Sequence, residues 1–502
     1  MKLNIEGNIN AYYVQTLCMI FFPGEKFTSP EEEDDHTLNL LLEEREEGAY
    51  ASVTISCEGK TATAEKLLPY REDLTADRLR KLVIGHVILS AAGEILHYRP
   101  SWGMLTGVRP SKVATELLLK GNSKTRTKKL LASDYLVIPK KAALATDVAL
   151  REQQIIGTPT LGDCSVYISI PFCPSRCSYC SFVSYTSKRL LSLIPEYLEL
   201  LKQEVREKFR IIKELGLRVL TVYIGGGTPT ILTAAQLSEL LEVINESTDV
   251  SSLLEFTLES GRPDTIDAEK MAVAKAYGVT RVCVNPQTLC DEVLNGIGRS
   301  HTTKDFYRAY DIAKASGIKC INTDLIVGLP GDTFTTFSAT FDEILRLDPE
   351  NITVHTFCVK RSAALRQKDG IYTLASTDAA KSVEYSQMQA KLAGYRPYYM
   401  YRQKNTVGNL ENVGYALPGA EGLYNVFMME ELHTIFAAGA GAVTKLVRRQ
   451  SPKDGNSVIE RIFMPKYPYE YLRDAEKLRS GDPETGIPSE RERILSFYQG
   501  EK

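Results

Sequence analysis

The chain has 502 residues, 43% hydrophobic and 25% charged, which is the composition of an ordinary globular protein of about two to four domains. Its 60 lysines and arginines nearly balance 63 aspartates and glutamates, so the net charge of −3 provides no overall field for nucleic acid or an acidic membrane. No uninterrupted apolar run reaches the roughly 20 residues of a membrane-spanning helix. We therefore predict neither a nucleic-acid partner nor a membrane span.

Residues 1–160 are predicted to form an N-terminal α+β accessory domain. The run Ala51–Cys57 alternates like a half-buried strand, and Leu79–Ala92 has the periodicity of a helix. The segment Ser101–Pro110 holds the only tryptophan of the chain and two glycines. We interpret this segment as a structured linker that packs on the following domain; a loop that contacts substrate is the alternative.

Between 161 and 365, apolar β-rich runs alternate with helical patterns. This alternation predicts parallel strands with helices outside the sheet. The predicted strands are Val166–Ile170, Val219–Ile224, Leu253–Leu258, Arg281–Val284, Cys320–Val327 and Ile352–Phe357. The predicted helices are Tyr197–Leu215, Leu237–Ile244, Ile266–Ala276, Lys304–Ser316 and Thr336–Leu347. Six such units fit a partial (β/α)6 barrel of the α/β class, in which chemistry collects at the carboxyl ends of the strands.

Residues 366–502 are predicted to form a helical, loop-rich C-terminal region that covers the substrate. It contains Ala437–Ala442, a run of alanine and glycine in which the backbone must approach something closely. The prediction is thus an α+β domain, a partial barrel and a helical C-terminal region.

Cys173, Cys177 and Cys180 form the most informative motif, C-x3-C-x2-C directly after the first barrel strand. Three thiolates so spaced can hold three irons of a [4Fe–4S] cluster, which leaves the fourth iron open to bind and reduce a ligand. The alternative is zinc with a distant fourth ligand, or no metal. Ten cysteines in 502 residues and the absence of a signal-like apolar start argue against a disulfide framework. We therefore expect reduced thiols and a cytoplasmic protein.

Glycine or polar residues recur after successive strands. Each of them alone is better explained by a tight turn, a strand-end cap or a surface ion pair, but their recurrence favours one shared site. They are Gly225–Thr230 after the second strand, Glu259 at the end of the third, Gln287 after the fourth, Arg299 farther along the same connection, and Asp324 in the fifth.

These motifs resemble those of the radical S-adenosylmethionine (SAM) superfamily, and in particular the oxygen-independent coproporphyrinogen III dehydrogenases of the HemZ type. The resemblance covers roughly residues 160–445. It rests on Tyr167–Cys173, the cysteine loop, Gly-Gly-Gly-Thr-Pro-Thr, Asn295–His301 and the segment around Asp324. The segment Trp102–Pro110 is similar to the HemZ type in particular.

The resemblance implies two cofactors, a [4Fe–4S] cluster held by Cys173, Cys177 and Cys180, and SAM. In this family a glycine run and a carboxylate bind the methionine part of SAM, an arginine its carboxylate and an aspartate its ribose. Carried over to this chain, the expected SAM contacts are Tyr167, Tyr179, Gly226, Gly227, Thr228, Glu259, Gln287, Arg299 and Asp324. No catalytic side chain beyond these is assigned.

The implied reaction is the oxidative decarboxylation of two propionates of coproporphyrinogen III to vinyl groups, which gives protoporphyrinogen IX. The implied partners are the tetrapyrrole and a low-potential electron donor such as flavodoxin or ferredoxin. The cations available to a tetracarboxylate lie beyond the sixth strand: Lys360, Arg361, Arg366, Arg396, Arg402 and Lys404.

Two departures from the family pattern leave a second function open. The dehydrogenases carry a further cysteine two residues after the last cluster cysteine, where this chain has Phe182. The related haem chaperones carry a His-Asn-x-x-Tyr-Trp motif, where this chain has Tyr424–Met429 without the His, Tyr and Trp. We favour the dehydrogenase. The haem chaperone is the main alternative, and a radical SAM enzyme with another substrate is the third possibility.

Overall fold

The computed structural model describes residues 1–28, 34–157, 162–180, 182, 184–358, 377–403, 406–449, 457–481 and 488–500. They form two compact units. Within the described ranges, the first unit consists of 1–151 and 400–411, and the second of 152–358, 377–399 and 412–500. Lys360, Arg361, Arg366 and Lys404, predicted to meet the substrate carboxylates, lie outside the described residues.

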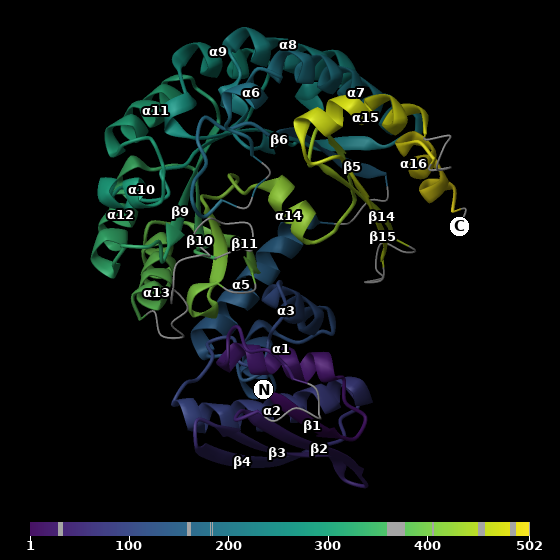
Figure 1. Cartoon of the computed structure of the whole chain (residues 1–502), viewed down its shortest axis with the longest axis vertical. Coiled ribbons are helices and arrows are strands. Elements are labelled where there is room, and N and C mark those ends of the chain that lie inside the picture. Colours follow the sequence, from purple (N-terminus) through teal and green to yellow (C-terminus); the bar gives the residue numbers. More distant parts are fainter. Residues whose placement is uncertain are drawn as a thin grey trace. The chain divides into compact units, whose positions relative to one another are not determined.

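The first unit contains a four-stranded sheet in the order β1-β2-β3-β4 and helices that pack on it (Figure 1). Apolar side chains of β3 such as Ala51, Val53 and Ile55 alternate into the core, as predicted, and α2 covers this face. The elements are β1 (Lys2–Glu6), α1 (Ala11–Phe21), β2 (Thr37–Arg45), β3 (Gly48–Cys57), β4 (Lys60–Pro69), α2 (Ala76–Leu96), α3 (Pro110–Leu119), α4 (Lys124–Ser133) and α5 (Pro139–Ile156).

The tryptophan segment is a packed part of the first unit. Trp102 is fully buried, and its indole N–H donates to a carboxylate oxygen of Glu411 at 2.9 Å. Lys141, also buried, forms an ion pair with the same carboxylate. The Arg402 guanidinium lies 5.8 Å from the Trp102 ring and donates to the carbonyl of Leu105. Arg402 is therefore a buried structural residue, and its prediction as a cation for substrate is wrong.

The second unit is built on an eleven-stranded sheet in the order β11-β12-β10-β9-β8-β7-β6-β5-β13-β14-β15. Its middle is a run of parallel strands, and six of them overlap the six predicted strands. These six strands are β5 (Asp163–Ile170), β6 (Arg218–Gly226), β7 (Glu255–Gly261), β8 (Arg281–Val284), β9 (Cys320–Val327) and β10 (Asn351–Thr356). The α/β class and the six-strand parallel core are confirmed, and no closed barrel forms among the described strands.

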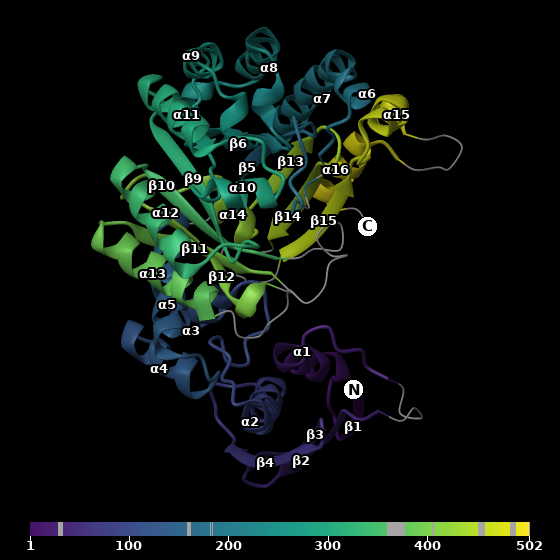
Figure 2. The ribbon, with the colours of Figure 1, turned by 60° about the vertical axis from the view of Figure 1, so that its left-hand side comes forward.

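Helices α7, α8, α9 and α11 lie on the outer side of this curved sheet (Figure 2). Side chains of the strands, including Ile168, Val222 and Phe256, are completely buried and form the core. Thr233, Thr302 and Thr333 start three of the helices with reciprocal capping bonds, which fixes where each strand-to-helix loop ends. The helices are α6 (Lys188–Leu191), α7 (Ile194–Glu214), α8 (Ala234–Ser247), α9 (Ala268–Ala276), α10 (Asp291–Gly296), α11 (Thr303–Ala315) and α12 (Phe334–Leu347).

The C-terminal region was predicted to be helical and loop-rich, but it also supplies five strands. They extend the sheet at both sides, and β13 pairs in parallel with β5. The prediction missed them because short buried runs such as Thr434–Ala438 carry no alternation that separates strand from buried helix. The elements are α13 (Thr377–Leu392), β11 (Arg396–Arg402), β12 (Glu411–Ala416), α14 (Leu423–Met429), β13 (Thr434–Ala438), β14 (Val443–Arg449), β15 (Ser457–Phe463), α15 (Pro468–Ser480) and α16 (Glu490–Gln499).

The run Ala437–Ala442 follows β13 beside the end of β5. A side chain at Gly439 would come within 2.6 Å of the Ser169 carbonyl, so the glycine permits this close approach. The Tyr197 hydroxyl accepts from the Ala440 N–H at 2.9 Å and donates to the Ser169 carbonyl at 2.8 Å. The predicted close contact is thus with the protein's own strand. Among the helices of the described residues, none is long and apolar enough to cross a membrane.

Candidate active site

Cys173, Cys177 and Cys180 lie on the loop that follows β5, at the carboxyl edge of the parallel strands. All three are free thiols; Cys173 and Cys177 are buried and Cys180 is half-buried. Burial raises the pKa of Cys173 and of Cys180, and the neighbouring cysteines add to this effect. Three thiolates in this loop therefore need a positive partner, which the irons of a cluster would supply.

The spacing of the sulfur atoms separates a cluster from a single metal ion. Around one tetrahedral zinc, sulfur atoms about 2.3 Å from the metal lie about 3.8 Å apart. Within the described residues, the only trio of His, Cys, Asp or Glu whose ligand atoms all lie within 4.8 Å of one another is Glu25, Asp34 and His36. The cysteine sulfurs are more widely spread, which fits a cluster whose irons each take a different thiolate.

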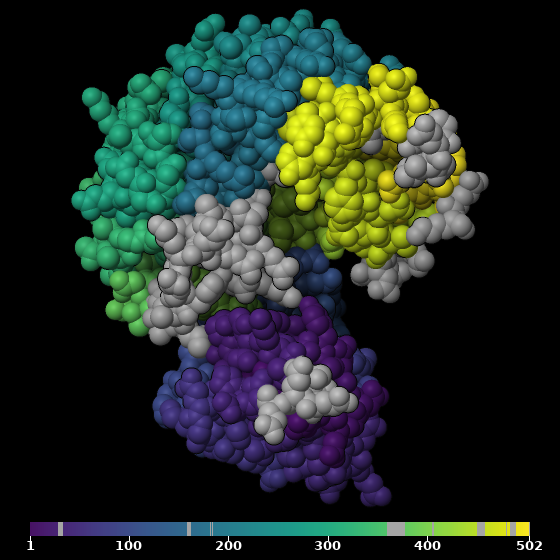
Figure 3. All heavy atoms as spheres, viewed as in Figure 1, coloured from purple at the N-terminus to yellow at the C-terminus, as the bar shows by residue number. Residues whose placement is uncertain are grey.

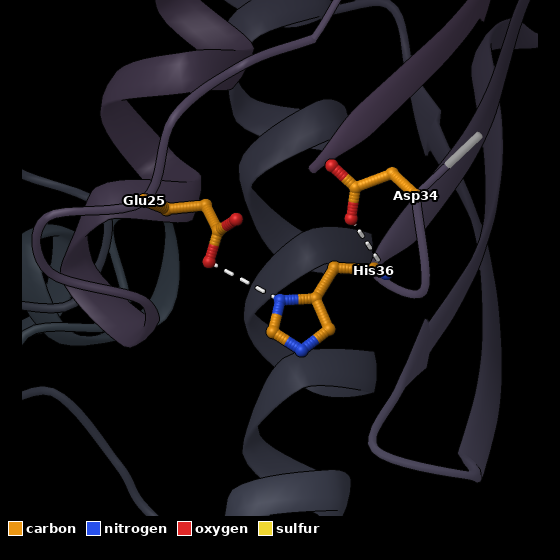
Figure 4. A group of neighbouring side chains, drawn as sticks. All are labelled: Glu25, Asp34 and His36. Carbon is orange, nitrogen blue, oxygen red and sulfur yellow. Dashed lines mark hydrogen bonds and ion pairs between the residues drawn. The ribbon is translucent and has the colours of Figure 1, made fainter. Parts of the chain in front are cut away.

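The trio Glu25, Asp34 and His36 lies in the first unit (Figure 4) and already has a cationic partner. The α-ammonium of Met1 donates to Glu25 at 2.9 Å and to Asp34 at 2.7 Å. The hydrogen bond from this ammonium to Asp34 is the main cause that lowers the pKa of Asp34 to about 2. We assign the trio to the anchoring of this ammonium group.

Backbone hydrogen bonds from three other segments fix the cysteine loop. The Thr228 N–H donates to the Phe172 carbonyl at 2.8 Å, and the Cys173 N–H donates to the Tyr185 carbonyl at 3.1 Å. The Ser178 N–H donates to the carbonyl of Ile297, two residues before Arg299, at 3.0 Å. The loop is therefore preorganised by the end of β6, by its own return segment and by the connection after β8.

Two buried arginines stand behind Cys177. Nη1 of Arg262 lies 3.8 Å from the Cys177 sulfur, and Nη1 of Arg299 lies 4.0 Å from it. Arg299 also donates to the Tyr179 hydroxyl at 3.1 Å and to the Gly261 carbonyl at 3.0 Å. Arg262 also forms a bidentate ion pair with Asp264, so Arg299 is the guanidinium whose charge offsets that of thiolates that bind iron. The remaining Nε of Arg299 has no hydrogen-bond partner.

The glycine run after β6 lies against the cysteine loop. Gly226 has φ of +106°, and a side chain at Gly227 would lie 2.5 Å from the Phe172 carbonyl oxygen. The Thr228 hydroxyl lies 3.2 Å from the Cys173 sulfur. The protein's own chain therefore already requires these glycines, a reason separate from the predicted contact with SAM.

An aromatic stack lines the interior of the sheet. The ring centroids of Tyr167 and Tyr223 lie 6.1 Å apart, and those of Tyr223 and Tyr424 lie 4.7 Å apart. Tyr223 donates its hydroxyl hydrogen to Glu259. Of these, only Tyr167 was a predicted site residue; Tyr424, at the start of α14, comes from the segment compared with the chaperone motif.

A line of polar groups continues from Glu259 across three strands. Nδ2 of Asn285 lies 3.0 Å from Glu259 and 3.0 Å from Asp324, and Nε2 of His355 lies 3.6 Å from Asp324. Burial, together with the charge of Asp324, raises the pKa of Glu259. Burial opposes charge on Asp324, but hydrogen bonds led by that of His355 outweigh it and lower the pKa of Asp324. Asp324 is the member of the pair that holds the negative charge.

Gln287 combines a strained backbone with a side-chain oxygen that accepts no hydrogen bond. Its φ is 70°, a left-handed value that is uncommon outside glycine, and its Oε1 is buried without a hydrogen-bond partner. Its N–H donates to the Asp324 carbonyl at 3.1 Å, which fixes it beside β9. Buried polar atoms without partners mark places that a polar ligand can complete. Gln287 Oε1, Arg299 Nε and charged Asp324 fit the amino, carboxylate and hydroxyl groups of SAM.

The sequence analysis missed Arg262, Tyr223 and Asn285. Arg262 and Asn285 directly follow strands, and both stand in segments that were singled out for a different residue, Glu259 and Gln287. Position after a strand was therefore a usable signal for both. Tyr223 lies inside an apolar run and had no such signal.

Comparison with known proteins identifies the family. A profile of the radical SAM superfamily matches residues 167–344. The oxygen-independent coproporphyrinogen-III oxidase-like protein HemZ of Bacillus subtilis is 36% identical over 488 residues, 92% of this chain and 95% of that protein. This chain belongs to the HemZ family of radical SAM proteins. The haem chaperone HemW of the same organism is 31% identical over 310 residues, 61% of this chain and 77% of that protein.

The fold agrees with this membership. The structure of coproporphyrinogen III oxidase HemN from Escherichia coli, a radical SAM enzyme, aligns with a TM-score of 0.50 and 21% identity, covering 66% of this chain and 72% of that one. As a radical SAM protein of the HemZ family, this chain uses a [4Fe–4S] cluster and SAM as its cofactors.

Proposed function

We propose that this HemZ-family protein oxidatively decarboxylates two propionates of coproporphyrinogen III to vinyl groups and so produces protoporphyrinogen IX. The single observation that carries the proposal is the 36% identity to the coproporphyrinogen-III oxidase-like protein over 92% of this chain. In each round one hydrogen atom, one CO2 and one electron leave the propionate, so a vinyl group remains.

In this proposal Cys173, Cys177 and Cys180 hold the cluster, and Arg299 offsets its charge. When reduced, this cofactor pair supplies the 5′-deoxyadenosyl radical that takes the hydrogen atom from the propionate. The protein's part is to place SAM and propionate and to exclude water.

The proposed SAM contacts follow the chemistry of the strand ends. Charged Asp324 would accept from ribose hydroxyls, and Glu259 and the Gln287 Oε1 would accept from polar hydrogens of SAM. Arg299 would donate to the carboxylate through its unpartnered Nε. Contacts are also proposed for Tyr167 within β5, for Tyr179 in the cysteine loop, and for Gly226, Gly227 and Thr228 at and after the end of β6. Residues 366–502 are proposed to cover the tetrapyrrole.

The test is an anaerobic assay of the reconstituted protein with coproporphyrinogen III, SAM and dithionite. The proposal expects CO2 and vinyl-bearing porphyrin, with 5′-deoxyadenosine formed in step. Cys177→Ala is the matched control that should give none of these products. Formation of 5′-deoxyadenosine without any change of the porphyrin would overturn the assignment of substrate.

A second candidate is a haem chaperone, which is favoured by the 31% identity to HemW and by Phe182 in place of the further cysteine. Against it, Tyr424 of the comparable segment is buried in the stack with Tyr167 and Tyr223. Stoichiometric, tight haem binding together with no decarboxylation would establish the chaperone. Weak haem binding beside turnover would exclude it.

A further inference from the structure

An exposed group of aromatic side chains lies beside the cysteine loop in the second unit. This aromatic patch consists of Tyr185, Tyr467 and Tyr469, and the exposed Phe182 precedes Tyr185 in the same loop. Phe182 is 67% exposed, Tyr467 43% and Tyr469 49%. The ring centroids of Tyr185 and Tyr467 lie 5.5 Å apart, and those of Tyr467 and Tyr469 lie 5.4 Å apart. Figure 3 shows blue atoms of the region around residue 180 against the yellow atoms of the C-terminal segment.

The aromatic patch is attached directly to the backbone that carries the cluster ligands. The Tyr185 N–H donates to the Pro171 carbonyl at 2.9 Å, and the Tyr185 carbonyl accepts from the Cys173 N–H at 3.1 Å. The backbone of Phe182 hydrogen-bonds the Cys180 thiol. The Tyr185 hydroxyl lies 3.3 Å from the carbonyl oxygen of Lys466, which joins the loop to the segment before α15.

The surroundings of the patch are mainly basic. Arg176 lies in the cysteine loop, Lys188 and Arg189 follow in α6, and Lys466 precedes Tyr467; all four are exposed. Within the part of the chain that the structure describes, none of the four forms an ion pair. The acidic group that faces Tyr185 is the half-buried Glu470. The rim therefore carries an excess of positive charge.

We propose that the aromatic patch and its basic rim dock a small acidic one-electron carrier protein, which reduces the cluster; this rests on the cluster of the proposed function. One electron passes from the reduced carrier to the cluster, no bond forms or breaks, and the carrier leaves oxidised. Transient redox complexes bury less than about 1,200 Å² in total, so their docking surfaces are small. Opposite charges would steer the encounter, and salt would weaken it.

The cysteines outside the C-x3-C-x2-C motif are scattered along the chain and do not repeat its spacing. The surface attached to the cysteine loop is therefore a direct entry for an electron from a carrier. The exposed rings match the aromatic enrichment of protein interfaces.

The test compares two reductants on the cluster-loaded protein, without any tetrapyrrole. The doubly substituted variant Lys466→Glu/Tyr469→Ser is compared with the matched control Lys213→Glu. Lys213 is an exposed lysine in the last turn of α7, which precedes β6 and so lies at the edge opposite the cysteine loop. Bleaching of the cluster absorbance and the electron paramagnetic signal are followed with reduced flavodoxin and, separately, with dithionite.

We expect the double variant to be reduced by flavodoxin at least tenfold more slowly at low salt, with the dithionite rate unchanged. The rate of the unsubstituted protein with flavodoxin should fall as salt rises, and Lys213→Glu should behave like it. Equal loss with both reductants would assign the patch to the cluster environment or to substrate, and no loss with either would place the carrier elsewhere; both results overturn the proposal. Because no porphyrin is present, failure of the decarboxylase proposal leaves the result interpretable.

Discussion

Glu411 in the first unit is buried and Glu259 in the second is half-buried, and their surroundings shift the pKa values of the two carboxyl groups in opposite directions. Burial would raise the pKa of Glu411, but the buried ammonium of Lys141 and the indole N–H of Trp102 outweigh burial and lower it. Burial raises the pKa of Glu259, and the charge of Asp324 raises it further. Glu411 is thus an anion with a cationic partner, whereas the surroundings of Glu259 favour its protonated, neutral form.

This difference distinguishes a buried polar group that stabilises the fold from a polar group that belongs to a ligand-binding site. A buried anion with a matched cation and a hydrogen-bond donor needs nothing more from outside. Two carboxylates bridged by Asn285, beside the unpartnered Oε1 of Gln287, remain incomplete until a polar ligand arrives.

Among the expected effects of substitution, the largest is loss of the cluster when one of the three loop cysteines is replaced. Cys177→Ala should abolish the electron paramagnetic signal of the reduced protein, because a single loop provides all three thiolates. Iron content and the signal are measured after anaerobic reconstitution. Cys320→Ala, at a buried cysteine of β9, is the control and should keep the cluster. A cluster retained by Cys177→Ala would remove the assigned ligand set.

On the structural side, Glu411→Ala should destabilise the protein by about 3–5 kcal/mol, the cost of leaving one buried partner of an ion pair without the other. Urea unfolding measures it. The double variant Lys141→Met/Glu411→Leu removes both charges and should recover most of the loss. A cost below about 1 kcal/mol would mean that Glu411 is no structural pair, and the comparison would fail.

Arg299→Ala should weaken SAM binding by about 1.5–3 kcal/mol, the range for a hydrogen bond to a charged group. Equilibrium binding of SAM to the cluster-loaded protein measures this, with iron content determined in parallel because Arg299 also contacts Cys177. Arg308→Ala, at an exposed arginine of α11, is the control. Unchanged SAM affinity with full iron content would limit Arg299 to positioning the loop.

The smallest effects are opposite pH dependences of two neutral variants. The folded pKa of Glu411 is lowered, so its contribution is present above the unfolded value of about 4.3 and is lost as pH falls. Glu411→Gln should therefore be less stable than the unsubstituted protein near neutral pH, and the gap should close in acid. The folded pKa of Glu259 is raised, so ionisation of the unfolded chain reduces stability as pH rises, and Glu259→Gln should be the more stable protein near neutral pH.

Unfolding in urea between pH 4 and pH 7 tests both variants together. The sign of each difference matters more than its size, since the two glutamates differ in surroundings and not in chemistry. Differences of the same sign would show that the two carboxyl groups are alike, and the distinction between paired anion and open site would be lost.

The six parallel strands, the cysteine loop and its place at the carboxyl edge could all be predicted from the sequence. These are local features: apolar runs of strand length, helical periodicity between them, and a ligand spacing that fits on one loop. β8 and β9 were predicted to the residue, because each is a short run with a clear break at either end.

Which side chains from distant segments come into contact could be seen only in the folded structure. Arg262 and Arg299 reach the same sulfur from different strand connections, and Asn285 bridges carboxylates from two other strands. The roles of Arg402, which the sequence offered as a cation for substrate, and of the strands β11–β15 also depended on partners far along the chain. Such contacts arise because the fold brings separate segments together, and neither periodicity nor spacing within one segment records which segments those are.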